Sequence, residues 1–474
     1  WTTLCLLLIT IKKILRLYLY PTLFAFSLLI PSFCYSQTRS FSLQDLDHKI
    51  GQAIFEKLWV FSPSSTKSSD GLGPLYNARS CKQCHDESKP YTDNFPPSLV
   101  VQLSIEPTNI KPENQILTTY LKHYGFIPEP TYGKQIQTFA YPGARSEATI
   151  TTKEYKQILQ FKDRESITLK HVEYQLTQLA YGELHADTKI SARVAPRMVG
   201  LGLLDQIPAP DIKRLADPHD SNKDGISGKI NTVWNPETQT FDLGKFGWKA
   251  TKASLNHQNL AALSTDIGVS SWLLPEPQGD CTTIQADCVN LARTTETHLR
   301  NSTNSDTDGE PEASREITDL LLAFSQTMGK KNHSAQPKKL TTAQINGREL
   351  FSRLGCQHCH QPSFKITQTN ESDMITTRKI SPYSDLLLHD MGQSLADNRS
   401  EFNANGHEWR TSPLWGIASY LAQTKTPHFL HDGRANSVLE AILWHGGEAE
   451  KSRQSFMNLK KHQRAQLIEF VESL

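Results

Sequence analysis

The stretch Cys81-Lys82-Gln83-Cys84-His85 decides how this chain is interpreted, because its pattern returns as Cys356-Gln357-His358-Cys359-His360. Each copy places two thiols two residues apart, with a histidine directly after the second thiol. That spacing is the attachment signature of c-type haem, in which both thiols bond to the porphyrin and the histidine binds the iron. We therefore predict two covalently bound haem c groups, anchored by Cys81, Cys84, Cys356 and Cys359, with His85 and His360 as proximal iron ligands.

A zinc site and a thioredoxin-like redox pair are the alternatives for two Cys-x-x-Cys pairs. A zinc ribbon keeps its two pairs close together, whereas these pairs lie far apart in the chain. Neither alternative requires a histidine directly after the second cysteine in both copies. Haem attachment is the better interpretation.

The N-terminus has the pattern of an export signal. Lys12, Lys13 and Arg16 precede the apolar run 17–33, and small residues follow it. We expect residues 1–36 to be a signal peptide, with an uncleaved membrane anchor as the alternative. The mature protein is then expected to be periplasmic, which agrees with covalent haem attachment, and it would contact a membrane only through an uncleaved leader.

The composition limits the class of protein. The chain has 474 residues, of which 38% are hydrophobic and 21% are charged, and its formal net charge is +1. Such a chain is long enough for two or more domains. It contains no basic run interleaved with aromatic residues, so we do not expect nucleic acid as a partner. A small redox protein or a small-molecule electron donor is compatible with this charge.

We expect a mostly α fold of two cytochrome c-like haem domains, with long irregular loops and small β elements. The first domain spans 41–337, with insertions, and the second spans 338–474. The boundary is compositional, because polar, turn-rich stretches lie on both sides of an apolar segment at helical spacing. That segment, near 317–324, predicts a bridging amphipathic helix. In the second domain, a helix beginning at Thr341 and a last helix over 460–474 are expected to cross beside the haem.

Cys281 and Cys288 remain once the haem cysteines and the leader cysteines are assigned. In an oxidising compartment, a short disulfide that staples a surface loop is the simplest account of this pair. A functional dithiol is the alternative, but nothing nearby in the sequence is set to lower a thiol pKa.

Motifs spread along the chain after the leader carry a resemblance. They are Gly71–Ala78, Ser191–Pro196, Gly200–Leu204, Asp224–Gly228, Phe246–Ala250, Arg410–Gly416, Phe429–Ala435 and Leu439–Ala449. In combination they resemble the di-haem oxidoreductase family, often called thiol oxidoreductases, which is related to the bacterial di-haem cytochrome c peroxidases. The resemblance implies peroxide reduction at the N-terminal haem, with electrons supplied through the C-terminal haem. Oxidation of a thiol or other small reductant is the alternative reaction, and a pure electron-transfer cytochrome without a substrate site is the alternative class.

The resemblance also suggests a sixth ligand for the second iron. Peroxidase relatives carry a methionine on the helix after His-Asp-Gly, and counting from 431–433 the equivalent residue here is His445. His/His ligation would give a lower reduction potential than His/Met, since a thioether favours ferrous iron. The alternatives are that Met391 binds this iron, or that His445 only caps its helix, where a cation is favoured.

For the first iron, the candidates for a distal ligand or a catalytic base are His185, Met198, His123 and His171, among which the sequence does not choose. Arg193, a further candidate for this site, and Arg410 hold similar positions in the two halves, as the haem motifs do, which indicates a duplication. An arginine near a haem can pair with a propionate. A surface salt bridge is the alternative role for each.

The loop 217–228 resembles a calcium-binding loop, because Asp220, Asn222 and Asp224 place oxygen atoms at every second residue before a glycine. Peroxidase relatives hold a calcium ion between their haem domains. An EF-hand loop that begins at Asp220 would need glutamate at its twelfth position, where Asn231 stands instead. Calcium is therefore one prediction for this loop, and Asx-turns built from the same residues are the other.

Overall fold

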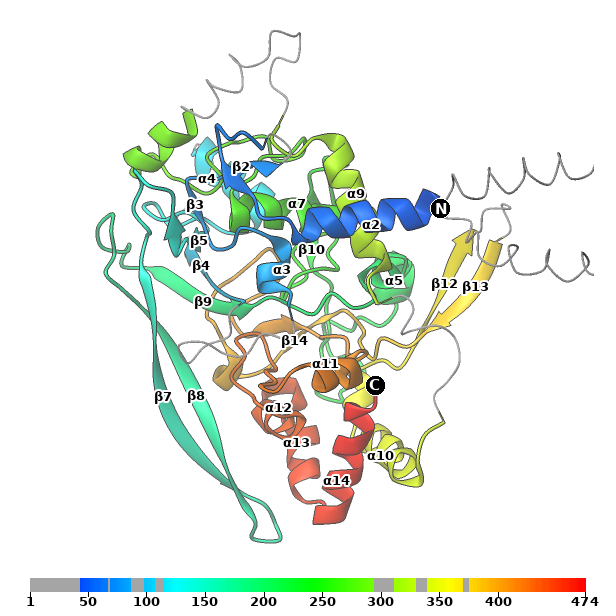
Figure 1. Ribbon diagram of the computed structural model, residues 1–474. Helices are drawn as coiled ribbons and strands as arrows, with labels where there is room; N and C mark the ends of the chain where they lie inside the picture. Colours follow the sequence, from blue (N-terminus) through cyan, green and yellow to red (C-terminus); the bar gives the residue numbers. More distant parts are fainter. Residues whose placement is uncertain are drawn as a thin grey trace, which may run out of the picture. The chain divides into compact units, whose positions relative to one another are not determined.

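Two pairs of packed helices lie beside the two Cys-x-x-Cys-His motifs in a computed structural model of the chain (Figure 1). The structure describes residues 43–66, 69–86, 98–106, 114–293, 311–329, 339–369 and 375–474. The first pair is α2 (Leu43–Glu56) and α9 (Arg315–Thr327), and α3 (Cys81–Cys84) carries the first motif. The second pair is α10 (Thr342–Arg353) and α14 (Lys461–Glu472), and the 3-10 turn η4 (Cys356–His358) carries the second motif.

The first helix pair meets at a glycine. A Cβ atom on Gly51 of α2 would collide with the carbonyl oxygen of Leu320 in α9, so no larger residue fits this approach of two backbones. One turn later, Phe55 packs against Phe324 with ring centroids 5.2 Å apart. The helix predicted near 317–324 is therefore present as α9. It does more than bridge, because it forms half of this first pair.

The second helix pair has the same construction. A Cβ atom on Gly347 of α10 would collide with the carbonyl oxygen of Gln466 in α14. Phe351 packs against Phe470 with ring centroids 5.6 Å apart. A capping box at Thr341 begins α10, because its side chain and that of the residue three positions on satisfy free backbone N–H groups. The predicted crossing of the first and last helices in this half is confirmed.

Strands form more of the protein than we expected from the sequence. The structure is 33% helix and 23% strand, with several small sheets, so the prediction of a mostly α fold is wrong. A three-stranded antiparallel sheet has the order β5 (Gln135–Ile136), β4 (Leu99–Ile105), β9 (Thr188–Val194). Antiparallel pairs are β7 (Thr149–Gln160) with β8 (Ser166–Thr177), β10 (Thr232–Asn235) with β11 (Thr240–Leu243), and β12 (Phe364–Thr369) with β13 (Ile375–Ile380). These segments are rich in threonine, isoleucine, valine and tyrosine, which favour strands.

Short elements connect these larger ones. Short strand pairs are β1 (Val60–Phe61) with β2 (Asp70–Leu72), β3 (Leu75–Tyr76) with β6 (Phe139–Ala140), and β14 (Leu388–Asp390) with β15 (Glu408–Arg410). Further helices are α4 (Gln115–Tyr124), α5 (Leu201–Asp205), α6 (Ala209–Lys213), α7 (Leu255–Ala262), the π-helical η2 (Leu263–Ile267), α11 (Ile417–Gln423), α12 (Val438–Trp444) and α13 (Glu450–Met457). The 3-10 turns η5 (Gln393–Leu395) and η6 (Gly447–Ala449) complete the second half.

The long β7–β8 hairpin reaches the C-terminal helix (Figure 1). Near its turn, Asp163 and Glu165 accept hydrogen bonds from Arg464 of α14 at 2.9 and 2.7 Å. Phe161 is buried in the same apolar cluster as α10 and α14, with the Arg464 guanidinium 4.0 Å from its ring centroid. The hairpin thereby covers one side of the second helix pair.

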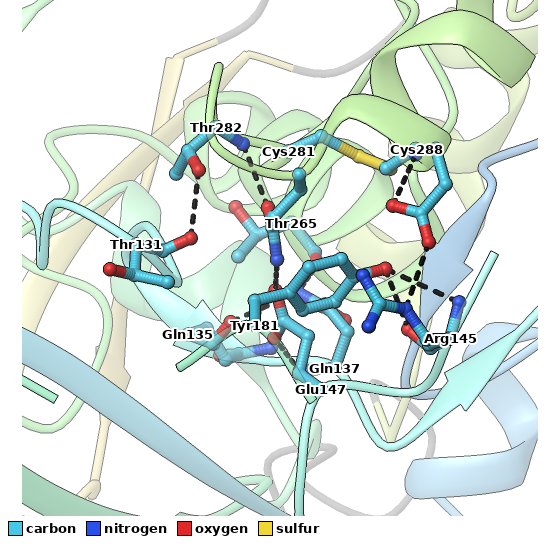
Figure 2. The surroundings of a disulfide bond; sticks show 12 residues. Thr131, Gln135, Gln137, Arg145, Glu147, Tyr181, Thr265, Cys281, Thr282 and Cys288 are labelled. Carbon is cyan, nitrogen blue, oxygen red and sulfur yellow. Dashed lines mark hydrogen bonds and ion pairs between the residues drawn. A yellow bond between two sulfur atoms is a disulfide. The ribbon is translucent and has the colours of Figure 1, made fainter. Parts of the chain in front are cut away.

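The disulfide between Cys281 and Cys288 is formed, which confirms that prediction (Figure 2). Beside it, the Thr282 hydroxyl donates to the carbonyl oxygen of Thr131 at 2.7 Å. The stapled segment is thus fastened to a part of the chain that lies far away in sequence. This placement favours a structural role for the disulfide.

Residues Asp47–Leu474 form one compact unit. The expected domain boundary lies within 330–338, outside the described residues, and it stays a prediction. The expected leader, residues 1–36, also lies outside them. In the part of the chain that the structure describes, no helix combines the length and the apolar character that a membrane crossing requires.

Candidate di-haem site

One continuous cavity of about 1130 Å³ connects the two Cys-x-x-Cys-His motifs. Its wall includes Cys84 and His85 from the first motif, and Cys359 and His360 from the second. Sites for one small molecule are commonly about 300–1,000 Å³. The cavity exceeds that range, as expected for a space that receives two porphyrins.

The first motif presents a neutral imidazole. The backbone carbonyl of Pro196 hydrogen-bonds to His85, and since proline has no N–H, the imidazole must be the donor. Burial lowers the pKa of His85 to about 4, so the ring is neutral at pH 7, the form that binds iron. Burial also raises the pKa of Cys81 to about 12, which argues against a reactive dithiol, because the thiolate is the nucleophile.

The second motif repeats this arrangement. The Nδ1 atom of His360 donates to the backbone carbonyl of Tyr383 at 3.0 Å, which leaves Nε2 for an iron ion. Burial, and then the neighbouring His445, lower the pKa of His360 to about 4. Burial raises the pKa of Cys356 to about 12. Both motifs therefore combine protonated thiols with a histidine held by a backbone carbonyl, and this fits c-type attachment better than a zinc or redox-dithiol site.

His445 lies opposite His360. Their ring centroids are 6.5 Å apart, and the Nδ1 atom of His445 donates to the backbone carbonyl of Ala441 at 2.7 Å. Metal–imidazole bonds are about 2.0 Å long, so two rings on opposite sides of one metal ion have centroids roughly 6 Å apart. The observed spacing fits a shared iron ion. Met391, the alternative ligand, also lines the cavity.

His445 stands at the end of a turn and helix that occur twice in the chain. Segment 429–444 has the same local backbone structure as segment 246–261, and the next residues are His445, where the helix has ended, and Ala262, where it continues. Each begins with an isolated antiparallel bridge, which pairs Phe429 with Ala435 and Phe246 with Lys252. In each, the second and fifth residues have positive φ: 69° and 77° for Leu430 and Gly433, and 81° and 51° for Gly247 and Ala250.

The helices that follow these turns also correspond. Ser437 caps α12 and Ser254 caps α7, each through a side-chain oxygen that accepts a backbone N–H three residues on. The sixth residue of each helix is a buried leucine, 1% exposed in α12 and fully buried in α7. This correspondence places Ala262 where the second copy has His445. Ala262 lines the cavity, and its methyl group offers no atom to a metal.

A carboxylic acid follows Ala262 on the cavity wall. Asp266 lies in η2, the π-helical continuation of α7, and its Oδ1 accepts a hydrogen bond from Gln135 at 2.7 Å. Burial raises the pKa of Asp266 to about 6. Single π-helical turns are frequent at functional sites, and an acid with a pKa near neutrality can exchange protons. We did not foresee either Ala262 or Asp266 from the sequence.

Comparison with known families agrees with this geometry. A model of the family described as di-haem oxidoreductase, putative peroxidase, matches residues 163–474. The chain belongs to this family. Membership implies haem cofactors and an oxidoreductase. The match includes the second motif and both copies of the turn and helix, and it begins after the first motif. A search of curated proteins returned no match.

The predicted distal candidates of this di-haem oxidoreductase are scattered. His185 has a side chain that is 46% exposed, and it is not among the residues that line the cavity. His171 is also not a lining residue and lies beside Trp444, with ring centroids 6.0 Å apart. His123 and Met198 do line the cavity. Met198 packs in the apolar cluster of the first helix pair, so it is the nearer of the two to the first motif.

Arg193 belongs to a buried ion network. Its guanidinium contacts the carboxylates of Asp397, at 3.1 Å, and Glu401. Lys249 reaches Asp397 at 2.7 Å, and Arg399 reaches Glu401 at 2.5 Å. The charge of Arg193 is therefore compensated by carboxylates of the protein itself. A surface salt bridge does not describe this buried network, and the pairing of Arg193 with a haem propionate stays a prediction.

A buried histidine beside the second motif was also missed. His389 lies between Asp385, 2.9 Å from its Nε2, and Glu448, 2.6 Å from its Nδ1. Burial alone would lower the pKa of His389, but hydrogen bonds to these carboxylates and to Cys359 raise it well above the usual value. Cys359, Asp385 and His389 have the atoms of a metal site within 4.8 Å. A histidine that donates from both nitrogens has no lone pair for a metal, so this cluster is a hydrogen-bond network.

The loop expected to hold calcium is closed by its own hydrogen bonds. Asp220 accepts the N–H of Gly225 at 3.2 Å, and Asn222 accepts the N–H of Asp224 at 2.9 Å. Asp224 in turn accepts the N–H of Ile226 at 2.9 Å. The bonds of Asn222 and Asp224, which each reach the N–H two residues on, are those of Asx-turns, the alternative interpretation of the loop. Calcium binding stays a prediction.

Proposed function

We propose that this protein is an exported di-haem c-type oxidoreductase that reduces peroxide at its first haem with electrons delivered through its second. A small redox protein or a small-molecule donor would supply those electrons. The observation that carries the proposal is the replacement of His445 by Ala262 in otherwise matching segments. We call the surroundings of motif 81–85 the first haem station and those of motif 356–360 the second. At the second station His445 lies opposite the motif histidine, whereas its counterpart Ala262 offers only a methyl group at the cavity wall.

The chain would hold its two haem groups in equivalent ways. Cys81 and Cys84 would bond the first porphyrin and His85 its iron, while the second motif does the same with its three residues. Haem iron, when bound, supplies the electron exchange and the position at which peroxide oxygen coordinates. Pro196 fixes the His85 ring, so the proximal side is set before any substrate arrives.

At the second station, His360 and His445 would both bind the haem iron. Both rings are oriented by backbone carbonyls, and burial lowers the pKa of each, so both remain neutral ligands at pH 7. Two fixed ligands leave no position for a substrate and limit rearrangement during electron transfer. The second haem would therefore store an electron and pass it on.

At the first station, Asp266 would move protons. Reduction of hydrogen peroxide to two water molecules consumes two electrons and two protons. The Asp266 carboxylate would take a proton from peroxide in the cavity and return it to the departing oxygen, and solvent would supply the remaining protons. Its pKa of about 6 lets it exist in both protonation states near neutral pH.

Export is supported by two independent features. The predicted leader directs the chain out of the cytoplasm, and the disulfide between Cys281 and Cys288 is typical of oxidising compartments. Covalent attachment of haem is consistent with the same location. We infer that the protein works in the periplasm.

Electronic spectra and ligand binding test this proposal. We expect one low-spin haem and one haem that becomes accessible in the oxidised or half-reduced protein, with cyanide and peroxide perturbing only the accessible one. Reduced cytochrome c and peroxide should then turn over faster than small thiols do. Faster oxidation of thiols would replace the peroxidase assignment with the thiol reaction. Two unchanging low-spin centres would show a pure electron carrier and remove the enzyme proposal.

A further inference from the structure

Lys252 and Arg410 are two cations on the cavity wall that have no carboxylate within ion-pair distance among the described residues. Glu401 attracts the charge of Lys252 and Asp385 that of Arg410 without direct contact. Arg410 is only 7% exposed, and its guanidinium donates to the backbone carbonyls of Gly247, at 2.9 Å, and Thr411, at 3.2 Å. The ammonium group of Lys252 has a single long contact, 3.5 Å, to the hydroxyl of Thr251. Both residues line the cavity that joins the haem motifs.

Other cationic residues nearby form ion pairs with carboxylates of the protein. Arg193, Lys249 and Arg399 all contact Asp397 or Glu401 in the buried ion network. Buried charges without a partner are costly, which is why buried lysine and arginine are normally paired. Desolvation accordingly lowers the pKa of Arg410 to about 10 and that of Lys252 to about 8. A carboxylate placed beside each of them would reduce this penalty.

The same turn brings both cations to the cavity. The backbone carbonyl of Lys252 accepts the N–H of Phe246 at 3.0 Å and closes the turn 246–252. Arg410 is fixed to this turn by its backbone N–H, which reaches the carbonyl of Trp248 at 2.8 Å, and by its side chain at Gly247. The turn belongs to the first copy of the repeated segment, whereas Arg410 comes from β15 in the second half of the chain. The two cations thus lie where the two halves of the site meet.

We propose that Lys252 and Arg410 form a carboxylate seat that holds propionate groups of the bound porphyrins. This inference rests on the proposed attachment of haem at both motifs. Haem propionates are ionised carboxylates, and they need cationic partners when they enter a buried space. The planar guanidinium of Arg410 can donate to a carboxylate through two N–H groups, while Lys252 adds a compact charge. Arg193, the other arginine expected in this role, already has protein carboxylates.

Reduction potentials of the haem-loaded protein test the seat. A positive charge near an iron ion favours the reduced state, so its removal should lower the midpoint potential of the nearer haem. We expect Lys252→Met and Arg410→Met each to shift the midpoint potential of at least one haem downward. Lys252→Arg and Arg410→Lys keep the charge and should stay closer to the wild-type potentials. Visible spectra and intact mass establish that both haem groups are present in each variant.

Lys245→Met is the matched control. Lys245 lies next to the same turn and lines the same cavity. In contrast to the ammonium of Lys252, which has one long contact, the ammonium of Lys245 makes two short hydrogen bonds, to the backbone carbonyls of Asp205, at 2.7 Å, and Ile207, at 3.0 Å. We expect smaller shifts in this variant. Unchanged potentials in both methionine variants, or an equal shift in the control, would overturn the seat. If Arg410→Met does not fold, Lys252→Met and Arg410→Lys decide the question. If the purified wild-type protein carried no haem, the proposed function itself would be wrong.

Discussion

The first and second haem stations are built from the same structural elements but differ at one residue. Each has a helix pair that meets at a glycine, two packed phenylalanines, a motif histidine held by a backbone carbonyl, and a capped helix behind the same turn. They differ at the residue that faces the motif histidine in the second station, where His445 corresponds to Ala262. We infer that one side chain separates an electron-relay centre from a reaction centre.

The largest expected effect is the removal of one station at a time. Cys81→Ser with Cys84→Ser should remove the first haem, and Cys356→Ser with Cys359→Ser the second, because each porphyrin depends on its own thiols. Intact mass should fall by one haem in each case. The first variant should retain a low-spin spectrum that cyanide does not change. A cyanide-sensitive spectrum there would reverse the assignment of the two stations.

The next largest effect is expected from variants that exchange Ala262 for histidine and His445 for alanine. Ala262→His should supply a second axial imidazole at the first station, remove its response to cyanide and abolish peroxide turnover. His445→Ala should do the opposite at the second station, which would then bind cyanide. Ala261→His places a histidine on the neighbouring cavity-lining residue and is the matched control. If both histidine variants leave the cyanide response intact, the correspondence of the two segments fails.

Proton transfer by Asp266 predicts a pH dependence. Its folded-state pKa is raised to about 6, so the carboxylate is protonated below that pH and can no longer accept a proton. Peroxide turnover should therefore fall as the pH drops through about 6. Asp266→Asn should lower turnover by about 100-fold, a usual contribution of general acid–base catalysis, and should remove this step from the pH profile. An unchanged profile would assign proton transfer elsewhere.

A smaller effect concerns the two helix pairs. Gly51→Val and Gly347→Val should each reduce the free energy of unfolding by roughly 1–3 kcal/mol, the usual cost of overpacking. Lys49→Val and Glu349→Val, at exposed positions of α2 and α10, control for the poorer helix propensity of valine. Denaturant unfolding of the haem-loaded protein measures all four. Equal losses in a glycine variant and its control would show that the helices do not meet there as described.

The smallest effect tests the caps of the repeated helices. Ser254→Ala and Ser437→Ala should each cost about 1 kcal/mol of stability through loss of an N-cap. Ser254 also donates to the carboxylate of Glu237, so its loss should be the larger of the two. Thermal unfolding compares them, and Ser254→Thr and Ser437→Thr, which keep a capping hydroxyl, are the controls. A larger loss of stability at Ser437 would contradict the expected contribution of the hydrogen bond between Ser254 and Glu237.

Much of the fold of the second half of the chain could be predicted from the sequence, and less of the fold of the first half. The glycine and phenylalanine of α10 lie close to the second motif, so the crossing with the last helix was predictable from spacing. In the first half, α2 and α9 are separated by more than half of the chain, and no local pattern pairs them. The β7–β8 hairpin was not predicted although its threonine, isoleucine and tyrosine residues favour strands, because most residues of β7 are exposed and no buried apolar face marks the strand in the sequence.

The sequence by itself predicted two haem-attachment motifs and the histidine that belongs to each, because such a motif consists of residues that are neighbours in the chain. Only the tertiary structure showed that His445 lies opposite His360, and that the corresponding residue of the first copy is Ala262 on the cavity wall. Ala262 and His445 belong to segments far from the motifs, and their equivalence is visible only when turns, caps and buried leucines are compared in space. Coordination at the second side of a metal is a long-range property, so a local pattern cannot encode it.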